Sequence, residues 1–156
     1  MRTIPLAAIS VLTVLVASLA AQAQPSPAPA NAEPYKNANT FKVGGEGGWD
    51  YLTVDSRNHQ LYVPRSTHTM VLDGATGKTI ADIPGQKRNH GVALVPEAGR
   101  GFISDGEDAS VVIFDLKTNA VLGKVKAAED ADGIIYDSAS RKVLVSCGDA
   151  NVLGVI

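Results

Sequence analysis

A repeat of about 42 residues constrains the fold of this chain more than any other feature of its sequence. Residues 73–78 (DGATGK) recur as residues 115–120 (DLKTNA), and residues 102–106 recur as residues 144–148, each time 42 positions later. Repeat units of this length that contain several short strands are typical of β-propeller blades. The third copy reaches only residue 156, so we expect this sequence to be the front part of a longer propeller.

Short apolar runs separated by Gly, Asp, Asn and Pro predict strands, four to a repeat in the first two copies. The predicted strands lie near residues 50–55, 60–65, 69–73, 79–84, 91–95, 101–105, 110–115, 121–126, 133–137, 142–146 and 151–156. Residues 92–95 (VALV) and 111–114 (VVIF) are apolar throughout, which indicates strands covered on both faces, as in stacked blades. The sequence therefore predicts an all-β fold, a β-propeller of about 2.7 four-stranded antiparallel blades after a signal-peptide helix.

The first residues have the pattern of an export signal. Arg2 precedes an apolar run over residues 6–20, and residues 21–23 (AQA) match a small-x-small cleavage site. An uncleaved membrane anchor is the alternative, but the run is shorter than the ~20 residues that a spanning helix needs. We expect a periplasmic or secreted protein whose parts are a signal peptide (1–23), a Pro/Ala-rich linker (24–42) and an incomplete propeller (43–156) with blades at about 43–85, 86–127 and 128–156.

Charge and cysteine content narrow the function classes. Loss of residues 1–23 removes one basic residue, Arg2, and leaves 13 basic and 16 acidic residues, a net charge of −3. Nucleic-acid-binding proteins usually carry a basic patch, and this mildly acidic chain gives no sign of one. Cys147 is the only cysteine, so the chain cannot close an internal disulfide. We interpret Cys147 as an unreactive residue at the end of a strand.

Asp50, His90 and Asp132 occupy the same position in successive repeats, immediately before the predicted innermost strand. The repeat would place them around one mouth of the central channel, with Trp49 beside Asp50. Two carboxylates and an imidazole could orient a small polar ligand or a cation, and we take these four residues as candidate ligand-binding residues. The alternative is that each side chain caps its own strand through local hydrogen bonds. We expect no catalytic residue, metal ion or cofactor in this part of the chain.

Three other patterns invite a functional interpretation and do not support one. Residues 73–79 (DGATGKT) are similar to a phosphate-binding loop, but Leu72 stands where its first Gly is required, so we predict a hairpin turn. Residues 44–48 (GGEGG) are interpreted as a flexible entry that lets the backbone approach the propeller axis. The acidic loops 105–108 and 129–133 lack the full spacing of a calcium loop and are interpreted as solvated turns.

Several short motifs carry a resemblance to a known family. Residues 61–63 (LYV), 71–73 (VLD) and 76–78 (TGK) resemble the YVTN-type, WD40-like repeats of YncE-like exported bacterial proteins, and the second copy is looser. The resemblance covers roughly residues 43–156 and implies a β-propeller, usually of about seven blades in the whole protein. It implies little about function, because repeat residues build blades rather than sites.

These observations favour a binding or scaffold protein whose channel mouth holds a small ligand or a protein partner. The alternative is a propeller enzyme of lactonase or dehydrogenase type that uses acidic mouth residues. An enzyme needs a converging polar cluster with perturbed ionisation, whereas the sequence offers one candidate per repeat, so we expect binding rather than catalysis. Nucleic-acid binding is a distant third. The apolar segment 152–156 is expected to be an open edge through which this chain, made alone, would self-associate.

Overall fold

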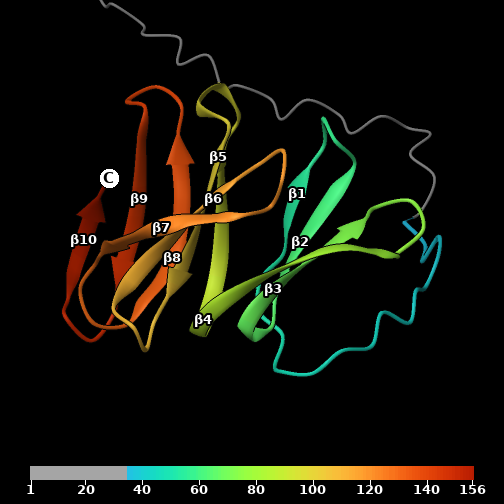
Figure 1. Cartoon of the computed structure of the whole chain (residues 1–156), viewed down its shortest axis with the longest axis horizontal. Coiled ribbons are helices and arrows are strands. Elements are labelled where there is room, and N and C mark those ends of the chain that lie inside the picture. The colour runs from blue at the N-terminus through green and yellow to red at the C-terminus, as the bar shows by residue number, and fades with distance from the viewer. Residues whose placement is uncertain (1–34) are drawn as a thin grey trace, which may run out of the picture. The chain divides into compact units, whose positions relative to one another are not determined.

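The computed structural model describes residues 35–156, which form ten strands and one short 3₁₀ turn (Figure 1). No α-helix occurs in this range, in agreement with the all-β prediction. None of the described residues forms a helix long and apolar enough to cross a membrane. The predicted signal peptide, with residues 24–34 of the predicted linker, lies outside the described residues. The strands all belong to one compact unit, Ala38–Ile156.

Two antiparallel sheets contain these strands, and each strand pairs with its neighbour in the chain. The first sheet consists of β1 (Thr53–Asp55), β2 (Gln60–Pro64), β3 (Ser66–Asp73), β4 (Thr79–Val95), β5 (Arg100–Asp105), β6 (Ser110–Asp115) and β7 (Val121–Lys126). The second sheet consists of β8 (Ala131–Asp137), β9 (Lys142–Cys147) and β10 (Val152–Val155). The 3₁₀ turn η1 (Pro96–Ala98) joins β4 to β5. The observed strands lie close to the predicted ranges.

β4 is one long strand that belongs to two blades (Figure 1). Residues 79–84 pair with β3, and residues 92–95 pair with β5. Pro84 and Gly85 signal a turn in the sequence, which is why two separate strands are predicted here. The structure corrects this prediction, because the chain passes straight on with Gly85 at a φ of 86°. The first blade is therefore β1–β3 with the start of β4, the second is the end of β4 with β5–β7, and the third is β8–β10.

Buried polar side chains hold the middle of β4 in place. Gln86 and Asn89 are 3% and 2% exposed, and Thr69 from β3 is fully buried between them. The Gln86 side-chain amide donates to the carbonyl oxygens of Ile83 and Pro84. The Asn89 amide donates to the Thr69 hydroxyl, which in turn donates to Gln86 Oε1. These bonds satisfy groups that would otherwise be costly to bury, and they fix the crossing from one blade to the next.

Aspartates close the turns between the third and fourth strands of the first two blades. The Thr76 hydroxyl and amide donate to Asp73 Oδ1 and lower the pKa of that carboxyl. Asp115 accepts the same pair of bonds from Thr118, 42 residues later, and its pKa is lowered in the same way. The loop that is similar to a phosphate-binding motif is thus a hairpin turn between β3 and β4, as predicted.

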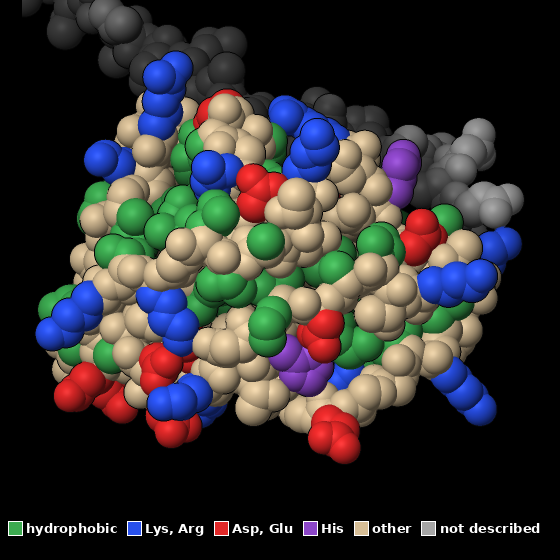
Figure 2. Space-filling model, viewed as in Figure 1, with side chains coloured by type: hydrophobic (Ala, Val, Ile, Leu, Met, Phe, Trp, Pro, Cys, Tyr) green, Lys and Arg blue, Asp and Glu red, His purple; other side chains and the backbone are tan. Residues whose placement is uncertain are grey.

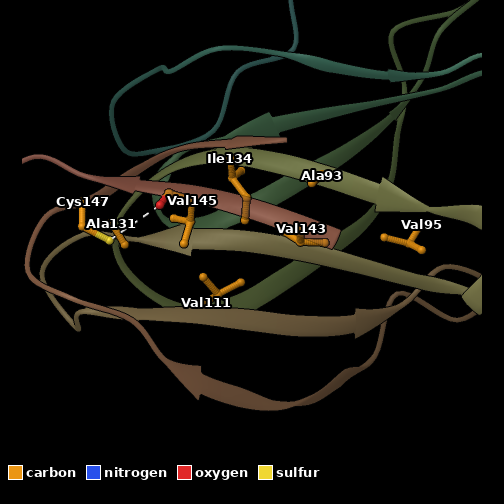
Figure 3. Packing of buried hydrophobic residues seen from close by; sticks show 8 residues of the cluster. All are labelled: Ala93, Val95, Val111, Ala131, Ile134, Val143, Val145 and Cys147. Atoms are coloured by element: carbon orange, nitrogen blue, oxygen red, sulfur yellow. Dashed lines mark hydrogen bonds between the residues drawn. The ribbon is translucent and has the colours of Figure 1, made fainter. Parts of the chain in front are cut away.

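Three apolar clusters form the core, and two of them lie between blades. The cluster between the first and second blades contains Tyr62, Val71, Ile83, Val92, Ile103, Val112 and Phe114. The cluster between the second and third blades contains Ala93, Val95, Val111, Ala131, Ile134, Val143, Val145 and Cys147 (Figure 3). A smaller cluster on the outer face of the first blade contains Val63, Met70 and Leu72. Covered strand faces explain the continuous apolar runs of the sequence. Cys147 is 1% exposed.

Burial of Tyr62 makes the stability of the protein depend on pH in the alkaline range. Its phenol is fully buried, and desolvation followed by the nearby Asp55 charge raises the pKa of Tyr62 from 10.0 to about 12. Because the folded state holds this proton more tightly, its stabilising contribution is complete below pH 10 and is lost as the pH rises from 10 to about 12. A shift of this size corresponds to about 2–3 kcal/mol.

Urea titrations of the wild type and Tyr62→Phe between pH 8 and 12 test this expectation. The free energy of unfolding of the wild type should fall relative to that of Tyr62→Phe above pH 10, because phenylalanine has no proton to lose. The difference between the two proteins removes the contributions of other groups that titrate in this range. A difference that does not change with pH would contradict the prediction.

Candidate ligand site

The structure brings Asp50, His90 and Asp132 together. His90 Nδ1 lies 2.8 Å from Asp50 Oδ2 and 3.8 Å from Asp132 Oδ1, so the imidazole stands between two carboxylates. Asp50 precedes β1, His90 lies in β4 just before its apolar end, and Asp132 is the second residue of β8. The three blades therefore each contribute one side chain at the start of the inner strand. This is the arrangement that the repeat register predicts.

The three side chains differ in their access to solvent. The carboxylates of Asp50 and Asp132 are 37% and 50% exposed, whereas the His90 side chain is 16% exposed. Asp50 Oδ1 also accepts a hydrogen bond from the amide of Tyr51, a local bond of the kind that caps a strand. His90 Nε2 is buried without a partner in the described part of the chain, and a Cβ on Gly106 would lie 2.9 Å from it. The exposed carboxylate oxygens leave acceptors that a ligand could use.

Tyr51 links the first blade to the third and was not identified from the sequence. Its hydroxyl donates to the carbonyl of Asp132 and accepts from the amide of Ile134. The ring passes over Gly91, where a Cβ would lie 2.0 Å from ring atoms, so only glycine leaves room for it. Burial, opposed in part by the Ile134 amide bond, raises the pKa of Tyr51. Tyr51 thus sets the position of the Asp132 backbone beside His90.

Trp49 lies away from this cluster in its contacts. Its ring stacks on the guanidinium of Arg65, with Cζ 4.2 Å from the ring centroid, and it lines an apolar pocket of about 210 Å³ together with Phe41 and Val43. Among the residues taken as candidates from the sequence, Asp50, His90 and Asp132 form one site and Trp49 belongs to a different feature.

That feature is a loop wrapped around a buried arginine. Arg65 is 2% exposed, and its guanidinium donates to four backbone carbonyls, those of Gly44, Gly45, Gly47 and Gly48. Residues 44–48 are therefore a cradle for a cation, and the interpretation as a flexible entry to the propeller axis is wrong. Positive φ angles at Gly45 and Gly47 are needed to point successive carbonyls inward. We call residues 43–49 the strap, because they cover the outer face of the first blade.

Charged side chains around the candidate site are largely paired. Arg88 donates to Asp130 from the second blade to the start of the third. Asp105 is fully buried, and it accepts from the Lys87 amide at 2.6 Å and from Lys124 Nζ at 3.0 Å. The prediction of a solvated turn is therefore wrong for Asp105, since its carboxylate anchors a hairpin. Figure 2 shows acidic and basic side chains interspersed over the visible face with hydrophobic ones between them.

The cluster does not have the geometry of a metal site. Within residues 35–156, no three His, Cys, Asp or Glu side chains are placed so that they could hold one ion. The 3.8 Å from His90 Nδ1 to Asp132 Oδ1 leaves a looser arrangement, suited to hydrogen bonds from a ligand's N–H or O–H groups.

Solved structures share this arrangement of blades. A hydrazine synthase chain from Kuenenia stuttgartiensis has a TM-score of 0.66 and 16% identity, over 79% of this chain and 36% of its own. A 6-phosphogluconolactonase candidate from Bacteroides fragilis has a TM-score of 0.64 and 21% identity, over 74% of this chain and 36% of its own. The chain has a β-propeller fold.

The comparisons go no further than the fold. Sequence identities of 16% and 21% show a shared architecture and leave activity undecided. The chain spans about a third of the length of either structure, 36% in both cases. No family model and no curated protein matches the sequence.

Proposed function

We propose that this chain is an exported, YncE-like propeller of the YVTN-repeat type whose channel mouth binds a small ligand rich in N–H or O–H donors. The observation that carries the proposal is the convergence of Asp50, His90 and Asp132 from three successive blades, with His90 Nδ1 2.8 Å from Asp50. A site built from several blades is what a ligand at a channel mouth requires. In this proposal the protein works in the periplasm or outside the cell, and nucleic acid is not its partner.

The charge of the cluster suggests the chemical class of the ligand. Two carboxylates face one imidazole, so the site offers more acceptors than donors and favours an ammonium or polyhydroxyl compound over an anion. A protein partner would use the same acceptors through a lysine or an arginine side chain. The partly exposed carboxylates can accept such bonds without burial of a new charge.

Calorimetric titration of small amines, polyols and sugar lactones tests the proposal. Asp50→Asn and Asp132→Asn should each weaken binding of the best ligand about 10- to 100-fold, the range expected for a hydrogen bond to a charged group. Asp149→Asn is the matched control, because it removes the same charge from an exposed turn of the third blade. Equal affinity of all four proteins for every ligand, or no binding at all, would refute the site.

A propeller enzyme is the second candidate, and the likeness to the 6-phosphogluconolactonase candidate is the observation that favours it. The same lactones separate the two proposals, because an enzyme consumes them and a binding protein returns them unchanged. Lactone hydrolysis that disappears in Asp132→Asn and persists in Asp149→Asn would favour the enzyme.

A further inference from the structure

The third blade exposes an apolar face. Ile135 and Leu153 are each 61% exposed, and together with Leu144 they line a shallow hollow of about 410 Å³. Large aliphatic side chains that gather in this way on a sheet usually mark a surface that another element covers.

The internal repeat shows what kind of element covers such a face. The residues 42 positions before Ile135, Leu144 and Leu153 are Ala93, Phe102 and Val111. Those three residues of the second blade pack against the third blade, and Ala93 and Val111 are 4% and 0% exposed there. The same positions are thus a buried interface in one blade and a solvent-exposed surface in the next.

The exposed face is continuous across all three strands of the third blade. Ile135 of β8 lies opposite Leu144 of β9, and Leu144 lies opposite Val155 of β10. Val155 is 60% exposed. The row ends at Asp137 and Lys142, which are paired across β8 and β9, so the face carries no net charge. A face of this kind can meet a copy of itself without electrostatic repulsion.

The opposite end of the described chain is closed. The outer face of the first blade, with Val63, Met70 and Leu72, is already covered by Val43 of the strap, and Arg65 holds the strap in place. Head-to-tail stacking of the third blade of one copy on the first blade of another would therefore have to displace the strap. Packing of two third blades requires no such displacement.

We propose that the apolar face defined by Ile135, Leu144 and Leu153 docks against the same face of a second copy. The interface is then isologous, so it closes as a two-fold dimer and does not continue into a filament. The two sheets pack face to face as sheets in a sandwich do, with aliphatic side chains interdigitated. The candidate ligand site plays no part in this contact, and either proposal can fail alone.

Sedimentation velocity of the chain purified after export tests the dimer over a dilution series. The wild type should sediment as a dimer at high concentration, and Leu153→Lys should weaken association at least about tenfold, because the change buries a lysine in an apolar contact. Leu122→Lys is the matched control, since Leu122 is 51% exposed on β7, outside this face, and should leave the dimer intact. Ile135→Lys provides a second, independent variant.

Three results would overturn the proposal. The wild type could remain a monomer at every concentration, or Leu122→Lys could dissociate the dimer as strongly as Leu153→Lys does. The wild type could also grow into ever larger species, which would indicate pairing through the free edge of β10 instead of a closed face-to-face contact. Circular dichroism of each variant confirms that the comparison is made between folded proteins.

Discussion

Replacement of Phe114 by alanine is expected to cause the largest loss of stability in this protein. The ring is fully buried between the first and second blades, with its centroid 5.5 Å from that of Tyr62. Removal of a buried aromatic side chain costs about 3–5 kcal/mol, because the surrounding atoms fill the cavity only in part. Urea denaturation should show this loss, while Leu122→Ala, at an exposed position of β7, should change the free energy of unfolding by less than about 0.5 kcal/mol.

A compensating exchange makes this prediction more specific. Phe114 lies opposite Gly101, where a Cβ would come within 2.1 Å of the ring, whereas the equivalent pair in the first blade is Leu61 and Leu72. Gly101→Leu alone should therefore destabilise the protein by overpacking. Combined with Phe114→Leu it should recover part of that loss, which a double-mutant cycle measures. If the two changes were additive, the exchange of volume between these positions would be disproved.

Arg65→Ala is expected to have the second largest effect. The guanidinium is 2% exposed and has four carbonyl acceptors, and each hydrogen bond to a charged group contributes about 1.5–3 kcal/mol. The variant leaves those carbonyls without their donor and releases the strap, so we expect a loss of at least about 3 kcal/mol. Arg65→Lys should recover little, because an ammonium cannot reach four acceptors arranged around a planar fork.

The strap gives this prediction a local measurement. Trp49 is the only tryptophan, and its ring stacks on Arg65, so its fluorescence should shift to the red in Arg65→Ala as the ring becomes hydrated. Gly47→Ala attacks the same cradle from the other side, since its φ is 84° and a Cβ would lie 2.1 Å from the Arg65 carbonyl oxygen. Both variants should lose the strap before the blades unfold. An unchanged emission spectrum in both would show that the cradle does not hold Trp49.

The sequence predicts the blades well because their order depends on local patterns. β6 and β7 coincide with the ranges expected from apolar runs and turn residues, and the Asp73 and Asp115 turns occur where the repeat places them. The continuity of β4 could not be predicted from Pro84 and Gly85. It depends on buried amide contacts between β3 and β4 that leave no periodic signal in the sequence.

The candidate site shows the same division. Asp50, His90 and Asp132 were found because they share one repeat position, and repeat positions come together in space. Tyr51 was missed because its partners, Asp132 and Ile134, are more than 80 residues away and share no pattern with it. Arg65 was missed for a related reason, since nothing in the glycine-rich segment before it indicates a buried cation. Ligand binding at the site stays a prediction until a titration decides it.

The strand shared by two blades also affects how the molecule folds. Every strand pairs with its sequence neighbour, so each step closes only a short loop, and the entropy cost of loop closure stays small. An unbroken β4 then joins the first two blades into a single cooperative unit, since neither can lose this strand without disrupting the other. The third blade starts a separate sheet and depends on side-chain packing alone. It is the part of the described chain that can open by itself.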